Sequence, residues 1–421
     1  MCISHMTTAF IAHLDIAELY PDAVDWPGAA GFSESIKQNC LSRHGWVIFD
    51  EQNRRSQTDS NADSSYQRSA LTREASIVFH PSSAEELAKA LRIVEFFRQS
   101  FAIRGGGHSP NPGWASIEGG ILISTDRMST LHFDAASETV SIGAGNRWGR
   151  VYKHLEKYGV LVTGGHSAPV GCVGQITGCG NSPWFHKYGW SCDNVVNFEV
   201  VVSGGKIVNA NKDENPDLWW ALKGGSNNFG IVTRMDMSTF PLPDGVWGGQ
   251  LYYDHSQATQ RQTIEAYYRF QMEHITQDSG VECLSGWAKI GPYKHIQKVL
   301  SADRAMPGNE HPKSFDDFFK LTPSAVRLGN CLASELAAHD EQAAVENSLE
   351  TRVYFSEATR SLMLCLVTKA DLDFYFEAVD IFYSAFEESY RGGGLTMSVQ
   401  LSCLYETRCE SPHKEVPDLQ C

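Results

Sequence analysis

Two glycine-rich segments of this sequence have the composition of ligand-binding loops. The first is RGGGHSP at Arg104–Pro110, and the second is Gly178-Cys179-Gly180, which follows Gly171 and Gly174. Glycine has no Cβ, so its backbone can approach a ligand closely and point amide N–H groups at a pyrophosphate. Because tight turns also use glycine, the triple glycine by itself indicates either a turn or a phosphate site.

Other nucleotide-binding and metal-binding signatures are missing from the sequence. No GxGxxG enters a helix with an acidic residue about 20 positions further on, and no GxxxxGK[S/T] occurs, so nicotinamide nucleotides and ATP are disfavoured. The eleven cysteines contain no CxxC pair. We therefore predict no metal site.

A β-α-β unit is expected to position the first glycine segment. Ser76–His80 is an apolar strand, and Ser83 with Glu86 three residues later is a capping box that opens a helix. Leu87, Leu91 and Val94 fall on one face of that helix, and a strand over Phe101–Arg104 runs directly into the glycines.

The second glycine segment is expected to follow further strands and one helix. Asn146 is expected to cap a helix that turns Val151 and Leu155 inward and stops at Gly159. The expected strands lie at Gly120–Thr125, Thr139–Gly145, Leu161–Gly165, Val195–Ser203, Lys206–Ala210 and Gly230–Phe240, with a two-glycine hairpin turn at Gly204-Gly205. A short helix is expected to start at Pro216.

The chain is predicted to divide after residue 242, where Pro241, Pro243 and Gly245 interrupt it. Residues 1–70 form a partly disordered N-terminal segment, residues 71–242 a ligand-binding domain, and residues 243–421 a second domain. In this second domain an antiparallel sheet should be backed by helices, with strands at Leu362–Thr368 and Leu395–Leu401 and helices at Gln257–His274 and Asp371–Tyr390.

Composition excludes several classes of partner. The net charge of −15 would repel phosphate backbones, so we expect no nucleic acid partner. No stretch reaches the roughly 20 apolar residues of a membrane helix, so we expect no membrane partner. The sequence shows no signal-peptide core and no N-x-Ser/Thr acceptor, and its cysteine number is odd. A cytoplasmic location is expected on these grounds.

Three blocks of the sequence resemble the FAD-linked oxidoreductases of the berberine bridge enzyme and vanillyl-alcohol oxidase family, in its fungal branch. They are RGGGHSPNPGW at Arg104–Trp114, KYGWSCDNVVNFEVV at Lys187–Val201, and NPDLWWALKGGSNNFGIVTR at Asn215–Arg234. The resemblance implies an α+β fold, with a PCMH-type FAD-binding domain of two subdomains and an α/β substrate domain with an antiparallel sheet.

The resemblance also implies how FAD is held. His108 matches the histidine that relatives bond to the 8α carbon of the flavin; a lone histidine beside glycines would otherwise be a loop residue bonded to the backbone. Relatives often add a second bond from a cysteine, but Ser167 stands at that position, so a single attachment is expected. The other implied FAD-binding residues are Arg104, Gly105, Gly106, Gly107, Ser109, Val170, Gly171, Gly178, Gly180 and Ile231.

Two departures from the family pattern lie near the second glycine segment. Gln175 and Cys179 stand where glycine is usual, and each is expected to add a side chain where the backbone lies against the flavin. Val170 resembles the position that controls access of oxygen to the reduced flavin in relatives, and a small valine there is typical of oxidases. The alternative role for Val170 is ordinary packing.

The resemblance predicts a reaction, and the sequence leaves an alternative open. The expected activity is removal of hydride from a C–H bond next to an alcohol or amine of a secondary metabolite or sugar, with O2 as electron acceptor. Relatives supply a Tyr or Glu base, but no residue here can be assigned as catalytic. By comparison with the family, the C-terminal segment is expected to be truncated or altered, and a catalytically impaired flavin-binding remnant or interaction protein is the alternative.

Overall fold

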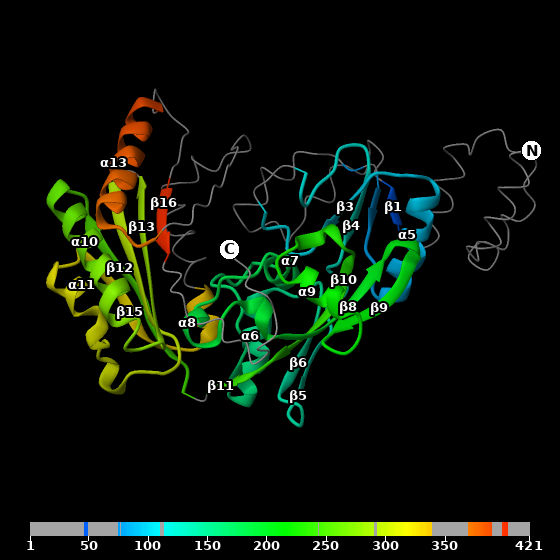
Figure 1. Ribbon diagram of the computed structural model, residues 1–421, viewed down its shortest axis with the longest axis horizontal. Coiled ribbons are helices and arrows are strands. Elements are labelled where there is room, and N and C mark those ends of the chain that lie inside the picture. Colours follow the sequence, from blue (N-terminus) through cyan, green and yellow to red (C-terminus); the bar gives the residue numbers. More distant parts are fainter. Residues whose placement is uncertain are drawn as a thin grey trace, which may run out of the picture.

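The computed structural model describes residues 46–48, 75, 77–109, 113–242, 244–289, 293–338, 369–389 and 398–402. Most of the predicted N-terminal segment and the strand predicted at Leu362–Thr368 lie outside these residues. We call the described residues within 46–242 the N-terminal half and those within 244–402 the C-terminal half (Figure 1).

The first sheet of the N-terminal half contains the predicted β-α-β unit. Its strand order is β1-β2-β4-β3, with β1 antiparallel to β2 and the other neighbours parallel. The bounds are β1 Trp46–Ile48, β2 Ile77–Phe79, β3 Phe101–Arg104 and β4 Ile121–Ser124. The helix α5 (Ala84–Phe96) connects β2 to β3, and its apolar side chains Leu87, Leu91 and Val94 are buried as predicted.

Only half of the predicted capping box forms at the start of α5. The hydroxyl of Ser83 accepts a hydrogen bond from the amide of Glu86 at 3.3 Å, as expected. The Glu86 carboxylate instead accepts bonds from the amide and hydroxyl of Ser82, at 2.7 and 3.0 Å. The helix therefore starts where the sequence predicts. The Glu86 carboxylate, however, accepts its hydrogen bonds from Ser82, the residue before the N-cap, and not from Ser83.

The second sheet is antiparallel and has the order β5-β6-β10-β8-β9. Its strands are β5 Leu131–Asp134, β6 Thr139–Gly143, β8 Val195–Val202, β9 Lys206–Asn211 and β10 Ile231–Ser238. The shorter elements of this half are α6 Trp148–Leu155, α7 Cys172–Thr177, α8 Phe185–Tyr188, α9 Pro216–Leu222, and the paired strands β7 Val160–Leu161 and β11 Phe240–Pro241.

The prediction that Asn146 caps the following helix is wrong. Arg147 is the N-cap of α6, and no side-chain cap bond forms. The buried Asn146 amide instead donates to the carbonyls of Thr130 and Gly143, at 2.8 and 2.9 Å. It satisfies two carbonyls beside β5 and β6, a use of asparagine that competes with capping. The strand expected over Leu161–Gly165 is also shorter, because only Val160–Leu161 pairs with β11.

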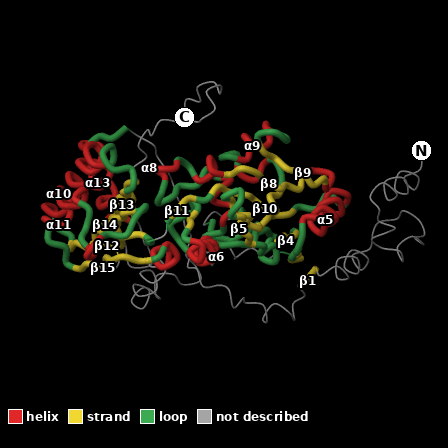
Figure 2. Tube along the Cα trace, turned by 90° about the horizontal axis from the view of Figure 1, so that it is seen from below, coloured by secondary structure: helices red, strands yellow, loops and turns green. Residues whose placement is uncertain are grey.

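The C-terminal half is an antiparallel sheet covered on one face by helices. The strand order is β15-β12-β14-β13-β16, and the bounds are β12 Val246–Asp254, β13 Val281–Lys289, β14 Tyr293–Ser301, β15 Ala325–Cys331 and β16 Ser398–Ser402. Figures 1 and 2 show the helices α10 (Gln257–Arg269), α11 (Asp316–Lys320) and α13 (Leu372–Ser389) on the face turned away from the N-terminal half.

Alternation along these strands sends neighbouring side chains to opposite faces of the sheet. Val281 and Val299 pack in the core beneath the helices. Leu300, one residue further on, packs in the core of the N-terminal half, together with Val246 and Leu336. The two halves therefore share a continuous apolar core, and the predicted α+β fold with an antiparallel second sheet is confirmed.

Candidate functional site

The glycine loop after β3 lies in direct backbone contact with the loop that precedes α7. A Cβ placed on Gly106 would lie 2.3 Å from the amide nitrogen of Gly171, and one placed on Gly171 would lie 2.3 Å from the amide nitrogen of Gly106. No real Cβ approaches another backbone this closely, so both positions require glycine. Two segments predicted separately from the sequence thus meet in one place.

Residues around the start of α6 hold the second of these loops, 165–171. The amide of Trp148 donates to the carbonyl of Val170 at 3.1 Å, and the amide of Gly149 donates to Ala168 at 3.0 Å. The Arg147 guanidinium donates to the carbonyl of Pro169. This pairing fixes the course of the loop up to Gly171, where Arg147 forms an antiparallel bridge.

His108 lies half-buried two residues beyond Gly106. Burial lowers the pKa of its imidazole, and the positive charge of Arg147 lowers that pKa further. The ring is therefore held in its neutral form at neutral pH. A neutral imidazole keeps the lone pair that a covalent bond from the ring nitrogen needs.

The second glycine segment adopts backbone conformations that favour glycine. Gly180 has a φ of 80° and Cys179 a φ of 72°, both in the left-handed region. A Cβ on Gly174 would meet nothing within 4 Å, and one on Gly178 would meet only carbonyl oxygens at 3.6 Å. The Cβ position of Gly174, inside α7, is accordingly unoccupied by other atoms of the chain.

The side chain of Gln175 is taken up inside the protein. Its amide donates to the carbonyl of Asn181 at 2.7 Å. A Cβ on either Gly165 or Gly180 would lie within 3.4 Å of the Gln175 side chain, which is therefore wedged beside both. Cys179 packs against Gly224, whose φ is 122°. The two departures from the family pattern thus have partners within the chain.

Ile231, the last of the predicted FAD-binding residues, opens β10 and is buried. It packs in one apolar cluster with Ile103 of β3, Ala144 and Val173 of α7. This cluster connects the strand before the first glycine loop to the helix after the second. Arg104, Gly105, Gly107 and Ser109 are half-buried in the first loop, as Val170 is in the second.

A polar pair at the carboxyl edge of the parallel strands was not predicted from the sequence. His80 follows β2, and its Nδ1 lies 2.7 Å from the Asp126 carboxylate, which follows β4. Burial pushes the pKa of Asp126 upward, but the hydrogen bond from His80, helped by the charge of Arg104 at the end of β3, brings that pKa below its ordinary value. The signal was available, because carboxyl ends of parallel strands share one edge.

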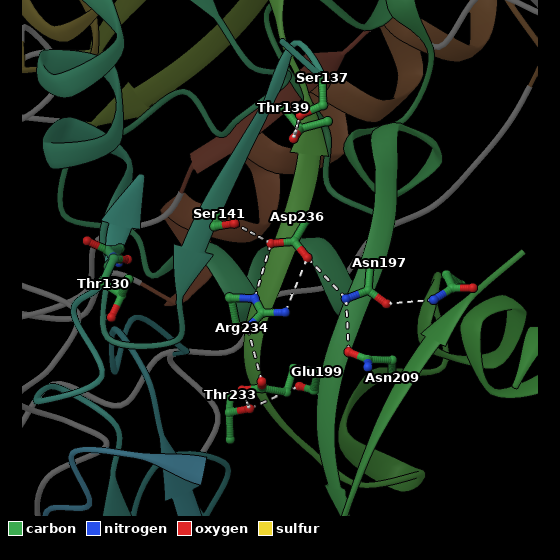
Figure 3. A network of polar contacts seen from close by, with 12 residues as sticks. Thr130, Ser137, Thr139, Ser141, Asn197, Glu199, Asn209, Thr233, Arg234 and Asp236 are labelled. Atoms are coloured by element: carbon green, nitrogen blue, oxygen red, sulfur yellow. Dashed lines mark hydrogen bonds and ion pairs between the residues drawn. The ribbon is translucent and has the colours of Figure 1, made fainter. Parts of the chain in front are cut away.

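Arg234 is the centre of a polar network across the second sheet (Figure 3). Its guanidinium donates to Glu199 at 3.0 Å and to Asp236 at 3.1 Å. The Asp236 carboxylate also accepts from Ser141 at 2.6 Å and from Asn197 at 3.0 Å. The network joins β6, β10 and β8, and its acceptors are occupied within the sheet.

Several polar contacts cross between the two halves. The indole of Trp184 donates to the carbonyl of Ala302, and the Lys187 ammonium lies 2.9 Å from the Asp303 carboxylate.

Among the described residues no three His, Cys, Asp or Glu side chains form a group that could hold a metal ion. In the same part of the chain, no helix is long and apolar enough to cross a membrane.

The glycines of the two loops leave the backbone without side chains at the candidate cofactor site. Gly106 and Gly171 leave no space for side chains between the two loops, and Gly174 leaves its own Cβ position open. Residues 75–211 match the family model described as the FAD binding domain. The match spans both predicted glycine segments and His108.

Curated fungal proteins resemble the chain over part of their length. An FAD-dependent monooxygenase of Penicillium roqueforti is 40% identical over 243 residues, which are 58% of this chain and 42% of that protein. A bifunctional solanapyrone synthase of Alternaria solani is 35% identical over 262 residues, 62% of this chain and 48% of that protein. The chain thus spans about half the length of these curated relatives.

Solved structures share the fold at low sequence identity. Chitooligosaccharide oxidase superposes with a TM-score of 0.64 at 19% identity, covering 86% of this chain and 74% of that one. Berberine bridge enzyme from Eschscholzia californica gives 0.58 at 19% identity, covering 72% and 64%. The 6-hydroxy-D-nicotine oxidase of Arthrobacter nicotinovorans gives 0.60 at 21% identity, covering 70% and 63%.

Proposed function

Because this chain carries an FAD binding domain over residues 75–211 in the fold of the berberine bridge enzyme, we propose that it is an FAD-dependent oxidase. Its flavin is bonded covalently to His108 and to no second residue. Its substrate is a small molecule with a C–H bond next to an alcohol or amine, and its electron acceptor is O2.

The backbone contact between Gly106 and Gly171 is the observation that carries the proposal. It joins the loop that bears His108 to the loop that bears Ser167, the two positions from which attachment is expected. His108 is neutral at this place, since burial and Arg147 lower the pKa of its ring. The serine hydroxyl at 167 does not form the second bond.

Several residues around the two glycine loops have a defined part in this proposal. The backbone amides of Gly105, Gly106 and Gly107 bind the pyrophosphate, and burial together with the charge of Arg147 favours the neutral form of His108. When bound, FAD supplies the acceptor for a hydride, and O2 then takes both electrons with two protons as hydrogen peroxide. Val170, half-buried in the loop 165–171, is the residue that would control access of O2 to the ring.

The names of similar proteins support a small-molecule substrate. The fungal relatives are named as monooxygenases and as solanapyrone synthase, and the similar structures as oxidases of chitooligosaccharides and hydroxynicotine. A secondary metabolite or a sugar fits this range. The monooxygenase names point to an alternative reaction, in which one oxygen atom of O2 enters the product.

Acid precipitation of the purified protein tests the attachment. We expect the yellow colour to stay with the polypeptide, and mass spectrometry to place the flavin on the peptide that contains His108. The variant His108→Ala should release all flavin on precipitation, whereas Ser167→Ala should retain it. Flavin released from the wild-type protein would contradict the proposal.

Turnover separates an oxidase from its alternatives. Candidate alcohols, amines and sugars are added under air, and hydrogen peroxide is measured together with consumption of O2. One peroxide for each product indicates an oxidase, and an oxygen atom from labelled O2 in the product indicates a monooxygenase. A covalent flavin that no substrate reduces favours the impaired flavin-binding protein.

A further inference from the structure

A largely buried contact between a histidine and a carboxylate joins the two halves of the molecule at the loop 165–171. The Nε2 atom of His166 lies 2.7 Å from the Oε1 atom of Glu282, and the two side chains are 19% and 7% exposed. His166 belongs to the loop, and Glu282 belongs to β13 of the C-terminal half. The two residues are 116 positions apart in the sequence.

Glu282 lies on the face of the sheet that is turned toward the N-terminal half. It pairs with Leu300 on β14, and Leu300 packs in the core of the N-terminal half. The neighbours Val281 and Cys283 point the other way, into the core beneath the helices. The carboxylate is therefore directed at the loop by the alternation of β13.

The same loop has a second bond to the C-terminal half. The amide of Ala168, two residues after His166, donates to the carbonyl of Ala337 at 3.1 Å. At its other end the loop touches Gly106 through Gly171. The loop is thus held between the glycine segment that bears His108 and the sheet of the C-terminal half.

Burial makes this pair more than a surface contact. A carboxylate that is 7% exposed loses most of its hydration, and this loss needs compensation by a charged or hydrogen-bonding partner. The hydroxyl of the nearby Tyr152 already donates to the carbonyl of Gly165. His186 is buried close by, and its Nδ1 has no partner among the described residues. His166 is the described side chain that lies within hydrogen-bond distance of the Glu282 carboxylate.

We propose that Glu282 is a positioning residue, which acts through His166 from across the domain interface and fixes the loop 165–171 against the glycine segment. The placement of the loop is a property of the chain alone. Its consequence for the flavin rests on the proposed function, since the flavin attached at His108 would lie beside this loop.

Hydrogen exchange of the protein without and with bound flavin tests the placement. In Glu282→Ala the amides of residues 165–171 should exchange about tenfold faster or more, the factor for one lost charge-assisted hydrogen bond. Glu282→Gln, which keeps a hydrogen-bonding group of the same shape, should lie between this variant and the wild type. Unchanged exchange of the loop in Glu282→Ala would overturn the proposal.

Lys187→Gln is the matched control at the same interface. It removes the contact of 2.9 Å between Lys187 and Asp303, which crosses the two halves but does not involve the loop. Its loop should exchange as in the wild type. Equal acceleration in Lys187→Gln and Glu282→Ala would show that the loop responds to any loosening of the interface, and would also overturn the proposal.

A second variant covers the case in which Glu282→Ala does not fold. The double variant His166→Leu/Glu282→Leu replaces the polar pair with two apolar side chains. Buried polar pairs often tolerate such a replacement. This protein should fold, yet exchange faster in the loop and bind its flavin with a shifted reduction potential. A double variant with wild-type loop exchange and potential would contradict a positioning role.

The outcomes for the two proposals can be told apart. If the wild-type protein carries no flavin, the proposed function fails, while the exchange of the loop in Glu282→Ala still decides the role of Glu282. If the wild type carries flavin and turns over but Glu282→Ala leaves the loop and potential unchanged, only the role of Glu282 fails.

Discussion

Gly106 and Gly171 lie in backbone contact, although 64 residues separate them in the chain. A Cβ on Gly106 would come within 2.5 Å of both the nitrogen and the Cα of Gly171. Unlike the end of a flexible side chain, the backbone of Gly171 cannot move aside to make room for this Cβ. The two loops therefore dock only while both residues are glycine.

Alanine at either position should separate the two loops. We expect Gly106→Ala and Gly171→Ala each to reduce the free energy of unfolding by about 1–3 kcal/mol, as overpacking does, and to abolish flavin incorporation. Gly174→Ala is the control for stability, since its Cβ would meet nothing within 4 Å. Thermal unfolding and the ratio of visible to ultraviolet absorbance measure both effects. Full flavin content in Gly106→Ala would contradict this account of the contact.

Arg147 should shift the pH below which attachment of the flavin slows. Burial and the charge of Arg147 keep the pKa of His108 below its ordinary value. The neutral ring therefore persists as the pH falls, and attachment should slow only below the ordinary histidine value of about 6.5. In Arg147→Gln the midpoint of this decline should move to higher pH, and incompletely, because burial is the larger cause. Rates of attachment to apoprotein, followed from pH 5 to 8, measure this midpoint.

Arg147→Lys separates charge from geometry. Arg147 also donates to the carbonyl of Pro169, which holds the loop 165–171. Lysine keeps the positive charge but not the planar guanidinium. If only geometry matters, the lysine and glutamine variants will share one midpoint, and the electrostatic role of Arg147 is then wrong.

The local parts of the fold could be predicted from the sequence. The helix after Ser83 and the strand Phe101–Arg104 follow from short-range periodicity and from the glycines that end the strand. Asn146 misled the prediction because its amide finds carbonyls near β5 and β6 that only the tertiary fold brings within reach. Capping preference is a local rule, and a buried side chain follows its three-dimensional neighbours.

The sequence proposed the residues of the candidate site through family resemblance, but it did not predict the contacts between them. Family resemblance singled out the segments around His108 and Gly178, and the glycines in these segments leave the backbone without side chains. No local pattern links His166 to Glu282, which lie 116 positions apart, or fixes the contact between His80 and Asp126, which lie 46 positions apart. Such pairs depend on how the strands are ordered in the sheets, which sequence periodicity does not determine.

Restoring glycine at Gln175 should weaken the protein instead of improving flavin binding. The side chain donates to Asn181 and fills the space beside Gly165 and Gly180. Gln175→Gly loses this bond and adds glycine inside α7, which together cost about 1–2 kcal/mol. Cys179→Gly should be close to neutral, because relief of the left-handed backbone offsets lost packing. Urea unfolding and flavin content test both variants, and higher flavin content in Gln175→Gly would contradict the expectation.

Arg234 should stabilise the second sheet through its two carboxylate partners. Arg234→Ala leaves Glu199 and Asp236 partly buried without their cation, and we expect a loss of about 1–3 kcal/mol in the free energy of unfolding. Arg234→Lys should recover part of this loss, because lysine supplies the charge without the forked geometry. Lys320→Ala, which breaks an exposed pair with Asp317, should cost less than about 1 kcal/mol. Urea unfolding at pH 7 compares the three, and equal losses for Arg234 and Lys320 would contradict the network's role.

Lys223 should make the protein more stable as the pH rises above neutrality. Burial lowers the pKa of its ammonium to about 8, although Asp193 opposes this effect. The ammonium lies 3.5 Å from the centre of the Trp219 ring. Below pH 8 the lysine is charged in both the folded and the unfolded chain, and folding removes that charge from water. Between pH 8 and the ordinary value of 10.5, the unfolded chain binds more protons, so the free energy of unfolding rises with pH.

The measurement compares the wild type with Lys223→Met in urea from pH 7 to 10.5. Since other groups titrate in both proteins, the difference between the two unfolding free energies isolates Lys223. This difference should shift in favour of the wild type as the pH increases from 8. Lys212→Met, at an exposed lysine 3.9 Å from Asp213, should show no such shift. A constant difference for Lys223→Met over this range would mean that the amine stays hydrated in the folded protein.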